Sequence, residues 1–427
     1  MELSRPPFAV TASPTSQCIM GCKSAVQLGA LVMEHGGTFD HTASAAAMWK
    51  LQTIVNGPID QSGRSSEVEA LEQLLQLMLT HLKSMGSRHV TTILQSLARL
   101  AYWDEAVLDS ILQHSARILA SFSPPCLVGT IWSLATLGHQ SAAGFVTSLL
   151  LKARSRIKEF TPLNLGLMLW SMAVLDIEES RCIREFLYHA LKLSQGPNLE
   201  MQIHQQLLST MSWIKDRQVD LTEKYQAIVA DIIQTSSSAL AVSPQSVPTV
   251  SRVQEDVLSV VRSLPGCQAK GNVELEHLTA DGLHSIDIAL MLPSRTHIAI
   301  EVDGPMHFLA CKDPSTGRLV LNGRTKLRNR LLEARGWRVL SVPVQEWCGI
   351  VTERERRAYL EDRLRKLGGL GGDEPKGRAG GAATCLAPQS STKDQRKGKV
   401  GVHLLLLIME MLTLHLKCIT LITTIFP

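Results

Sequence analysis

The sequence contains no CxxC pair, although it has nine cysteines. The two closest, Cys18 and Cys22, are not followed by a matching His/Cys pair at zinc-finger spacing. This pattern favours buried or idle thiols in a reducing compartment. The chain also lacks a strong net charge, because 43 basic and 39 acidic residues give a formal charge of +4. A nucleic-acid site is therefore to be sought in local clusters of charge.

The two ends of the chain differ from the rest. No acidic residue occurs from Leu3 to Met33, and residues 1–40 are expected to be a transit peptide or a disordered segment. Residues 404–427 form an apolar tail long enough to span a bilayer. Glu410, His415 and Lys417 lie inside it at a substantial insertion cost, so a membrane partner is not expected. An extra packed helix or an error in the gene model explains this tail better than an anchor.

A repeat is visible in the first half of the chain. The stretches ILQSLARL (Ile93–Leu100), TIWSLATL (Thr130–Leu137) and LMLWSMAVL (Leu167–Leu175) align at spacings of 37 and 38 residues. A weaker copy, LLSTMSWI (Leu207–Ile214), follows after about 39 more. A fixed period near forty residues is typical of stacked repeats.

Each repeat unit is predicted to be a pair of helices. Apolar residues recur at helical spacing in the second half of each unit, and prolines stand where a new helix would begin. Residues 42–217 therefore predict an α-helical solenoid, whose concave surface would bind an extended polymer, either RNA or peptide. Trp132 and Trp170 lie in the apolar stripes of their helices, which favours core packing over base stacking.

The second half predicts a small α/β domain. A Ser/Pro/Val-rich linker is expected at 236–250, and a helix at 253–264. Strands are expected at 285–290, 297–302 and 337–342, with a helix at 325–335. The domain is placed at 252–367 and is followed by a Gly-rich linker at 368–403.

The sequence of this domain resembles a known family. The runs SIDIAL (Ser285–Leu290), IAIEVDGPMHF (Ile298–Phe308) and NGRTKLRNRLLEARGWRVLSVPVQEW (Asn322–Trp347) are similar to a RAP domain, found in many organellar RNA-associated proteins. With the repeat of about 38 residues, the chain resembles octotricopeptide-repeat proteins of algal type. The resemblance implies a RAP domain of restriction-endonuclease-like fold and a role in organellar RNA metabolism, with the chloroplast favoured and the mitochondrion as the alternative.

Three acidic residues of this domain are the candidate catalytic site. In the endonuclease fold, an Asp and a Glu on neighbouring strands hold Mg²⁺ and a Lys orients the attacking water. The resemblance places Asp287 and Glu301 at the metal-binding positions, but Asp303 stands where the Lys is expected. The catalytic interpretation adds His307 as proton carrier. The alternative is a tight turn at Gly304–Pro305 beside acidic residues that no longer catalyse anything.

The following helix supplies the strongest charge signal. The segment from Arg318 to Arg338 carries seven basic residues and one acid, Glu333. Leu327, Leu331 and Leu332 form the buried side of the helix, so much of the charge is expected to face outward and to contact RNA phosphates. The residues predicted to bind RNA are Arg318, Arg324, Lys326, Arg328, Arg330 and Arg335.

Three functions stay open from the sequence. The first is a non-catalytic factor that binds single-stranded organellar RNA, alone or with RNA-processing proteins, in transcript stabilisation, processing or translation. The second is an endoribonuclease whose Asp287 and Glu301 bind Mg²⁺, the one cofactor that the resemblance implies. The third is a peptide-binding scaffold.

Overall fold

The computed structural model describes residues 14–368, apart from 60–64, 196–199, 243–249, 266, 269–271, 293–295 and 312–318. All of these lie in one compact unit, Met1–Gly372. The predicted Gly-rich linker and the apolar tail lie outside the described residues. No helix in the described ranges is long and apolar enough to cross a membrane.

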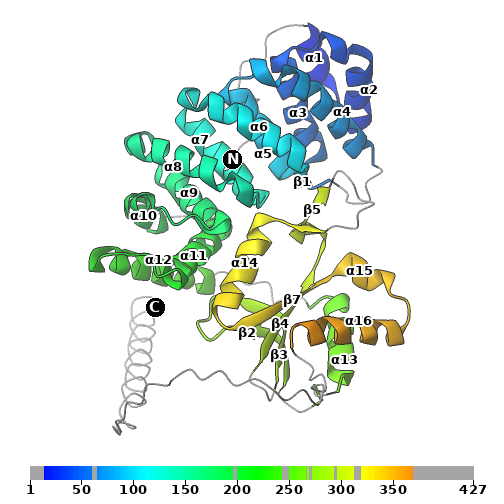
Figure 1. Cartoon of the computed structure of the whole chain (residues 1–427), viewed down its shortest axis with the longest axis vertical. Helices are drawn as coiled ribbons and strands as arrows, with labels where there is room; N and C mark the ends of the chain where they lie inside the picture. The colour runs from blue at the N-terminus through cyan, green and yellow to red at the C-terminus, as the bar shows by residue number, and fades with distance from the viewer. Residues whose placement is uncertain are drawn as a thin grey trace, which may run out of the picture. The chain divides into compact units, whose positions relative to one another are not determined.

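The first part of the chain is a solenoid of paired α-helices (Figure 1). The inner helices, which stack on one another, are α1 (Pro14–Gly21), α3 (His41–Val55), α5 (Ser87–Arg99), α7 (Pro124–Thr136), α9 (Pro162–Leu175) and α11 (Met201–Asp216). The outer helices are α2 (Ala25–His35), α4 (Ser66–His81), α6 (Glu105–Arg117), α8 (Ala143–Ser155), α10 (Ser180–Ser194) and α12 (Glu223–Val242). Inner helices from α5 onward begin at residues 87, 124, 162 and 201, so the predicted period of 37 to 39 residues is confirmed.

Local sequence explains where these helices begin and end. Pro124 and Pro162 occupy the first positions of α7 and α9, where a missing N–H costs nothing. A residue with left-handed backbone ends or follows each inner helix from α3 onward, at Asn56, Ala101, Gly138, Asp176 and Gln218. These positions turn the chain sharply from each inner helix toward the next outer one.

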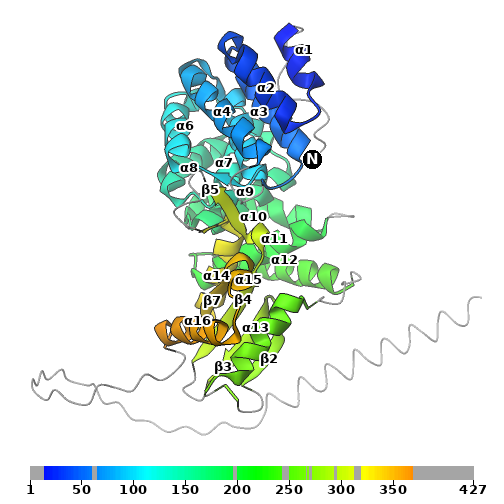
Figure 2. The ribbon, with the colours of Figure 1, turned by 90° about the vertical axis from the view of Figure 1, so that its right-hand side faces the viewer.

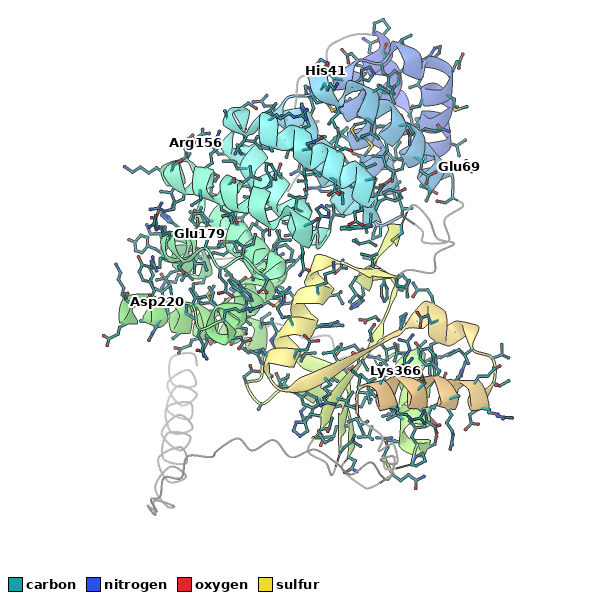
Figure 3. The ribbon with its side chains drawn as sticks, viewed as in Figure 1. His41, Glu69, Arg156, Glu179, Asp220 and Lys366 are labelled. Atoms are coloured by element: carbon teal, nitrogen blue, oxygen red, sulfur yellow. The ribbon has the colours of Figure 1, made fainter. Side chains whose placement is uncertain are left out.

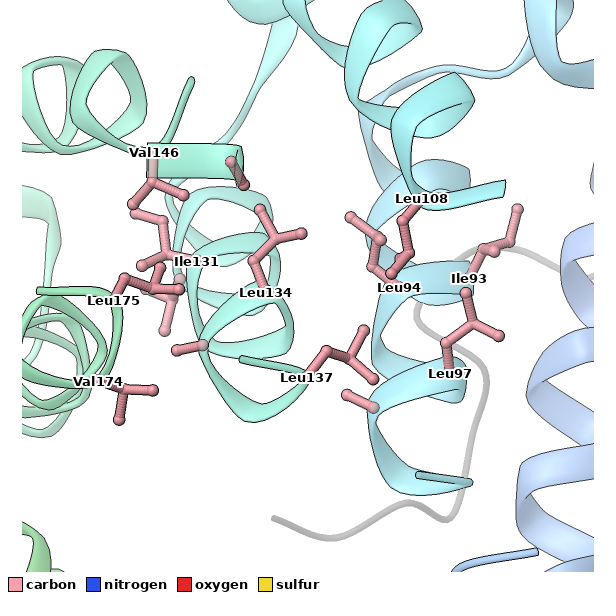
Figure 4. Close-up of a cluster of buried hydrophobic side chains, with 14 of the residues drawn as sticks. Ile93, Leu94, Leu97, Leu108, Ile131, Leu134, Leu137, Val146, Val174 and Leu175 are labelled. Atoms are coloured by element: carbon pink, nitrogen blue, oxygen red, sulfur yellow. The ribbon is translucent and has the colours of Figure 1, made fainter. Parts of the chain in front are cut away.

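The solenoid core is apolar and continuous from repeat to repeat. Figure 4 shows Leu94 on the side of α5 toward Leu134 and Leu137, with Ile93 and Leu97 on the opposite side of the same helix. Small residues let the helices approach closely. A Cβ added to Gly129 on α7 would lie 2.7 Å from the Thr91 side chain of α5. Trp170 is buried and Trp132 packs partly buried on the same core, as expected.

The structure differs from two predictions for segments that flank the repeats. Residues 14–35, expected to belong to a transit peptide or disordered segment, form α1 and α2, because Ile19, Leu28 and Val32 join the solenoid core. The expected linker at 236–250 begins inside α12, which continues to Val242. Ser236 is buried there, and its hydroxyl lies 3.2 Å from Nδ1 of His204.

The α/β region follows the predicted order, with additions (Figure 2). Its sheet has the order β2-β3-β4-β7, from Val273–Leu278, Ser285–Met291, His297–Asp303 and Trp337–Pro343. Strands β2, β3 and β4 are antiparallel, while β4 and β7 are parallel and joined through α14 (Gly323–Ala334). Helices α13 (Arg252–Ser263) and α16 (Glu353–Lys366) share the core of one sheet face, and α15 (Val344–Gly349) follows β7.

A second sheet joins the two halves of the chain. Strand β5 (Phe308–Cys311) pairs with β6 (Val320–Leu321) and, in parallel, with β1 (Tyr102–Trp103) from the solenoid. The N–H of Ala310 donates to the carbonyl of Ala101 at 2.7 Å. Leu309, Ala310 and Val320 belong to the solenoid core. The α/β region is therefore continuous with the repeats through both backbone pairing and apolar packing.

Candidate functional site

Strand β4 brings the predicted carboxylates together. Glu301 and Asp303 alternate with Val302, so their side chains project from the same face of the sheet, as predicted. Both are almost completely buried, at 1% and 0% exposure. Asp287 lies on β3, one residue beyond the last pair of the β3–β4 ladder, Ile288 and Ile300. Its Oδ2 accepts a hydrogen bond from the Val302 N–H at 2.7 Å and so extends the contact between the two strands.

A guanidinium lies between the two carboxylates of β4. Arg328 of α14 places Nη1 2.9 Å from Oε2 of Glu301 and Nη2 2.9 Å from Oδ1 of Asp303. Arg328 therefore does not face outward as predicted, because its side chain is only 22% exposed, and its contact with RNA stays an untested prediction. The position of Arg328 explains its orientation, because residue 328 lies one helical turn before Leu332, which packs on the sheet. Leu332, the apolar residue four positions after Arg328, was the sequence signal that could have indicated this inward orientation.

Asp303 is the best-satisfied carboxylate of the group. It accepts hydrogen bonds from Arg328 and from the hydroxyl of Ser341 on β7, and lies 3.0 Å from Nδ1 of His307. Burial opposes its ionisation, but the His307 hydrogen bond and the Arg328 charge hold its pKa below the usual value. The side chain of His307 is 36% exposed. An ionised Asp303 orients this imidazole by fixing a proton on Nδ1.

The pKa of Glu301 is shifted in the opposite direction from that of Asp303. Burial raises its pKa to about 8, against the opposing effect of the Arg328 charge. Its Oε1 is buried without a hydrogen-bond partner. Burial also raises the pKa of Asp287. The low-dielectric site therefore favours a proton on Glu301 near neutral pH, while Asp303 stays ionised.

This pKa gives a testable pH dependence. Between the ordinary value near 4.5 and about 8, folded Glu301 binds a proton more tightly than the unfolded chain does, so its contribution to stability falls as pH rises. Between pH 6.5 and 8 we expect the unfolding free energy of the wild type to decrease, and that of Glu301→Gln to decrease less. Urea unfolding of both proteins across that range checks this. Parallel curves for the wild type and the variant would contradict the assignment.

The acidic cluster does not suit a divalent cation. Arg328 fills the position between Glu301 and Asp303 that a bridging cation would take, and Asp287 is committed to the Val302 amide. In the described part of the chain, no group of three His, Cys, Asp or Glu side chains is placed to hold a metal ion. As arranged, Asp287 and Glu301 do not fit the Mg²⁺ site that the resemblance implies.

The remaining basic residues of α14 contact the solenoid. Lys326 donates from Nζ to the carbonyl of Gly138 at 2.8 Å, and its ammonium lies 5.8 Å from the centre of the Trp103 ring. Arg330 donates to the carbonyls of Ala173 and Val174 at the end of α9. These cations meet the carbonyl ends of α7 and α9, where partial negative charge accumulates.

Further contacts extend along α11. Arg324 donates to the side chain of Gln205 at 3.2 Å, and Arg335 forms ion pairs with Asp216 and Asp281 at 2.8 and 2.6 Å. The outward-facing arrangement predicted for Lys326, Arg330 and Arg335 is thus wrong. Their involvement in RNA binding is untested, and Arg318 lies outside the described residues.

Asp176 connects helix α14 to two neighbouring repeats of the solenoid. It follows α9 with a left-handed backbone (φ 61°) and accepts hydrogen bonds from the indole of Trp213 and from Arg217. Nη1 of Arg330 lies 3.3 Å from its Oδ1. Asp176 was not predicted from the sequence, because its contacts join segments more than 35 residues apart.

Helix α14 therefore has two buried faces. Leu332 packs on the sheet, whereas Leu327 and Leu331 belong to the solenoid core. Gly323, Lys326 and Arg330 share the solenoid-facing side at helical spacing. An amphipathic pattern with one apolar stripe could not reveal the second face, because basic residues make up much of it.

One comparison with known proteins identifies this region. Residues 300–363 match the family model of the RAP domain. The match runs from β4 to α16 and includes Glu301, Asp303, His307 and Arg328. RAP domains are generally RNA-binding domains, and the α/β region of this chain that follows the helical solenoid carries one.

Proposed function

We propose that this protein is a non-catalytic factor that binds single-stranded RNA in an organelle and acts in transcript stabilisation, processing or translation. The RAP match at 300–363 is the observation that carries this proposal. The solenoid supports it, because stacked helical repeats offer an extended surface to a linear polymer. The octotricopeptide type of the repeats and a chloroplast location, with the mitochondrion as alternative, belong to the same proposal. A fluorescent fusion excluded from both organelles would refute the location.

The occupied carboxylate cluster favours binding over cleavage. Arg328 neutralises part of the charge that a Mg²⁺-dependent nuclease would use for its metal. The test is the fate of end-labelled single-stranded RNA incubated with the full chain, with and without Mg²⁺. We expect retention of intact RNA at low salt in both conditions.

The other two hypotheses predict different results in the same experiment. Cleavage that requires Mg²⁺ and disappears in Asp287→Asn, with binding preserved, would establish the endoribonuclease. Absence of RNA retention at low salt would refute RNA binding and favour the peptide-binding scaffold.

A further inference from the structure

The solenoid has two edges, formed by the two kinds of connection between its helices. On one edge, each outer helix ends and the next inner helix begins, over residues 77–90, 114–127 and 152–165, and over 191–195 with 200–204. On the other, each inner helix ends and the next outer helix begins, over 96–109, 134–147, 172–185 and 213–226. Contacts within each edge join neighbouring repeats. Lys152 donates to the carbonyl of Leu119 on the first edge, and Trp213 donates to Asp176 on the second.

Charge is segregated between these edges. The first, here called the basic edge, carries eight basic residues and two acids, Glu159 and Glu200. The basic residues are Lys83, Arg88, Arg117, Lys152, Arg154, Arg156, Lys158 and Lys192. The second, here called the acidic edge, carries ten acids and six basic residues over its four segments. Figure 3 labels Arg156 of the basic edge and Glu179 and Asp220 of the acidic edge.

The RAP domain uses the acidic edge. Arg330 and Arg335 pair with Asp176 and Asp216, and Lys326 binds the carbonyl of Gly138. Each of these partners lies in one of the acidic-edge segments. The charge of the acidic edge therefore has an intramolecular role, namely docking of the basic helix α14.

The basic edge has no such partner among the described residues. Lys83, Arg88, Arg117, Lys158 and Lys192 are exposed, and no ion pair within the described ranges involves them. They occur in four successive connections, so each of these connections contributes at least one exposed cation. Tyr188, 46% exposed, lies beside Lys192, whose ammonium is 5.0 Å from the ring centre.

We propose that the basic edge of the solenoid is the surface that binds the phosphate backbone of single-stranded RNA. This inference rests on the proposed RNA-binding function and adds the location of the contact. A row of cations drawn from successive repeats can follow a linear polyanion, and release of the counterions of that polyanion makes binding salt-dependent and largely independent of sequence. Tyr188 offers an exposed aromatic face for a base at one end of the row.

The test compares two double variants with equal changes of charge. Lys83→Gln/Lys158→Gln neutralises two exposed cations of the basic edge, and Arg181→Gln/Lys215→Gln neutralises two exposed cations of the acidic edge. All four side chains are exposed, so both variants are expected to fold, and their circular dichroism melting curves check that. Binding of a labelled mixed-sequence single-stranded RNA and of polyuridylate to the full chain is measured over a salt series.

We expect the basic-edge variant to bind both RNAs at least about tenfold more weakly at low salt. Its slope of log K against log salt should be shallower by about 0.7 for each phosphate that the protein no longer neutralises. The acidic-edge variant should retain wild-type affinity within about twofold. Equal weakening of both variants, or an unchanged basic-edge variant, would overturn the assignment while leaving RNA binding intact. A wild-type protein that binds neither RNA would overturn the proposed function as well.

Discussion

Replacing Gly323 by alanine is expected to destabilise the protein by about 1–3 kcal/mol, the usual cost of overpacking. A Cβ at this position would lie 1.8 Å from the carbonyl oxygen of Ala135 and 2.7 Å from Cγ1 of Val174. The methyl group can be accommodated only if α14 moves away from the ends of α7 and α9. That movement would lengthen the hydrogen bonds of Lys326 and Arg330, which lie on the same face of α14.

Helix propensity makes this prediction specific, because alanine is favoured over glycine in helices by up to about 1 kcal/mol. Gly144, the second residue of α8, is the matched control, since a Cβ added there would have no neighbouring atom within 4 Å. Gly144→Ala should leave stability unchanged or increase it. Urea unfolding followed by circular dichroism measures both. A Gly323→Ala protein as stable as the Gly144→Ala protein would contradict close docking of the RAP domain on the repeats.

Removal of the Arg328 side chain is expected to have the larger effect. Arg328→Ala leaves Glu301 and Asp303 buried without their shared cation, and loss of one partner of a buried pair costs about 3–5 kcal/mol. Part of that stability should return as pH falls from 8 to 5, because protonation removes the uncompensated charges. The free energy of unfolding at several pH values measures both effects.

The same variant reveals the relation between this cluster and a metal site. With the guanidinium gone, Glu301 and Asp303 present oxygen ligands of the kind that Mg²⁺ and Ca²⁺ prefer. We therefore expect divalent cations to raise the melting temperature of Arg328→Ala but not that of the wild type. Arg154→Ala, which removes an ion pair with Glu185 at partly exposed positions, is the control and should cost at most about 1 kcal/mol without a metal response. An Arg328→Ala protein with unaltered stability would refute the neutralising role of Arg328.

Much of the architecture was predictable because it depends on local pattern. The period near 38 residues comes from one helix pair per repeat, and it fixed the positions of α5, α7, α9 and α11. Alternation of Ile286, Ile288 and Leu290 identified β3. Strand β5 was not predicted, because its partner Tyr102–Trp103 lies some 200 residues earlier in the chain.

The candidate site was likewise predictable only where it depends on local pattern. Glu301 and Asp303 share a face, as two-residue spacing on a strand requires. The sequence could not show that Arg328 points to them while Arg330 points to Asp176, since both residues belong to one basic run. Their directions depend on two surfaces that exist only after folding, one on the sheet and one on the acidic edge of the solenoid.

The most direct test of RNA binding at the basic edge is ultraviolet crosslinking of single-stranded RNA to the full chain, followed by mass spectrometry of the crosslinked peptides. We expect crosslinks in the basic-edge segments 77–90, 114–127, 152–165, 191–195 and 200–204, together with the peptide that contains Tyr188. We expect none at Lys326, Arg328 or Arg330 of α14, whose side chains bind the protein itself. Crosslinks confined to α14, or no crosslinks at low salt, would contradict RNA binding at this edge.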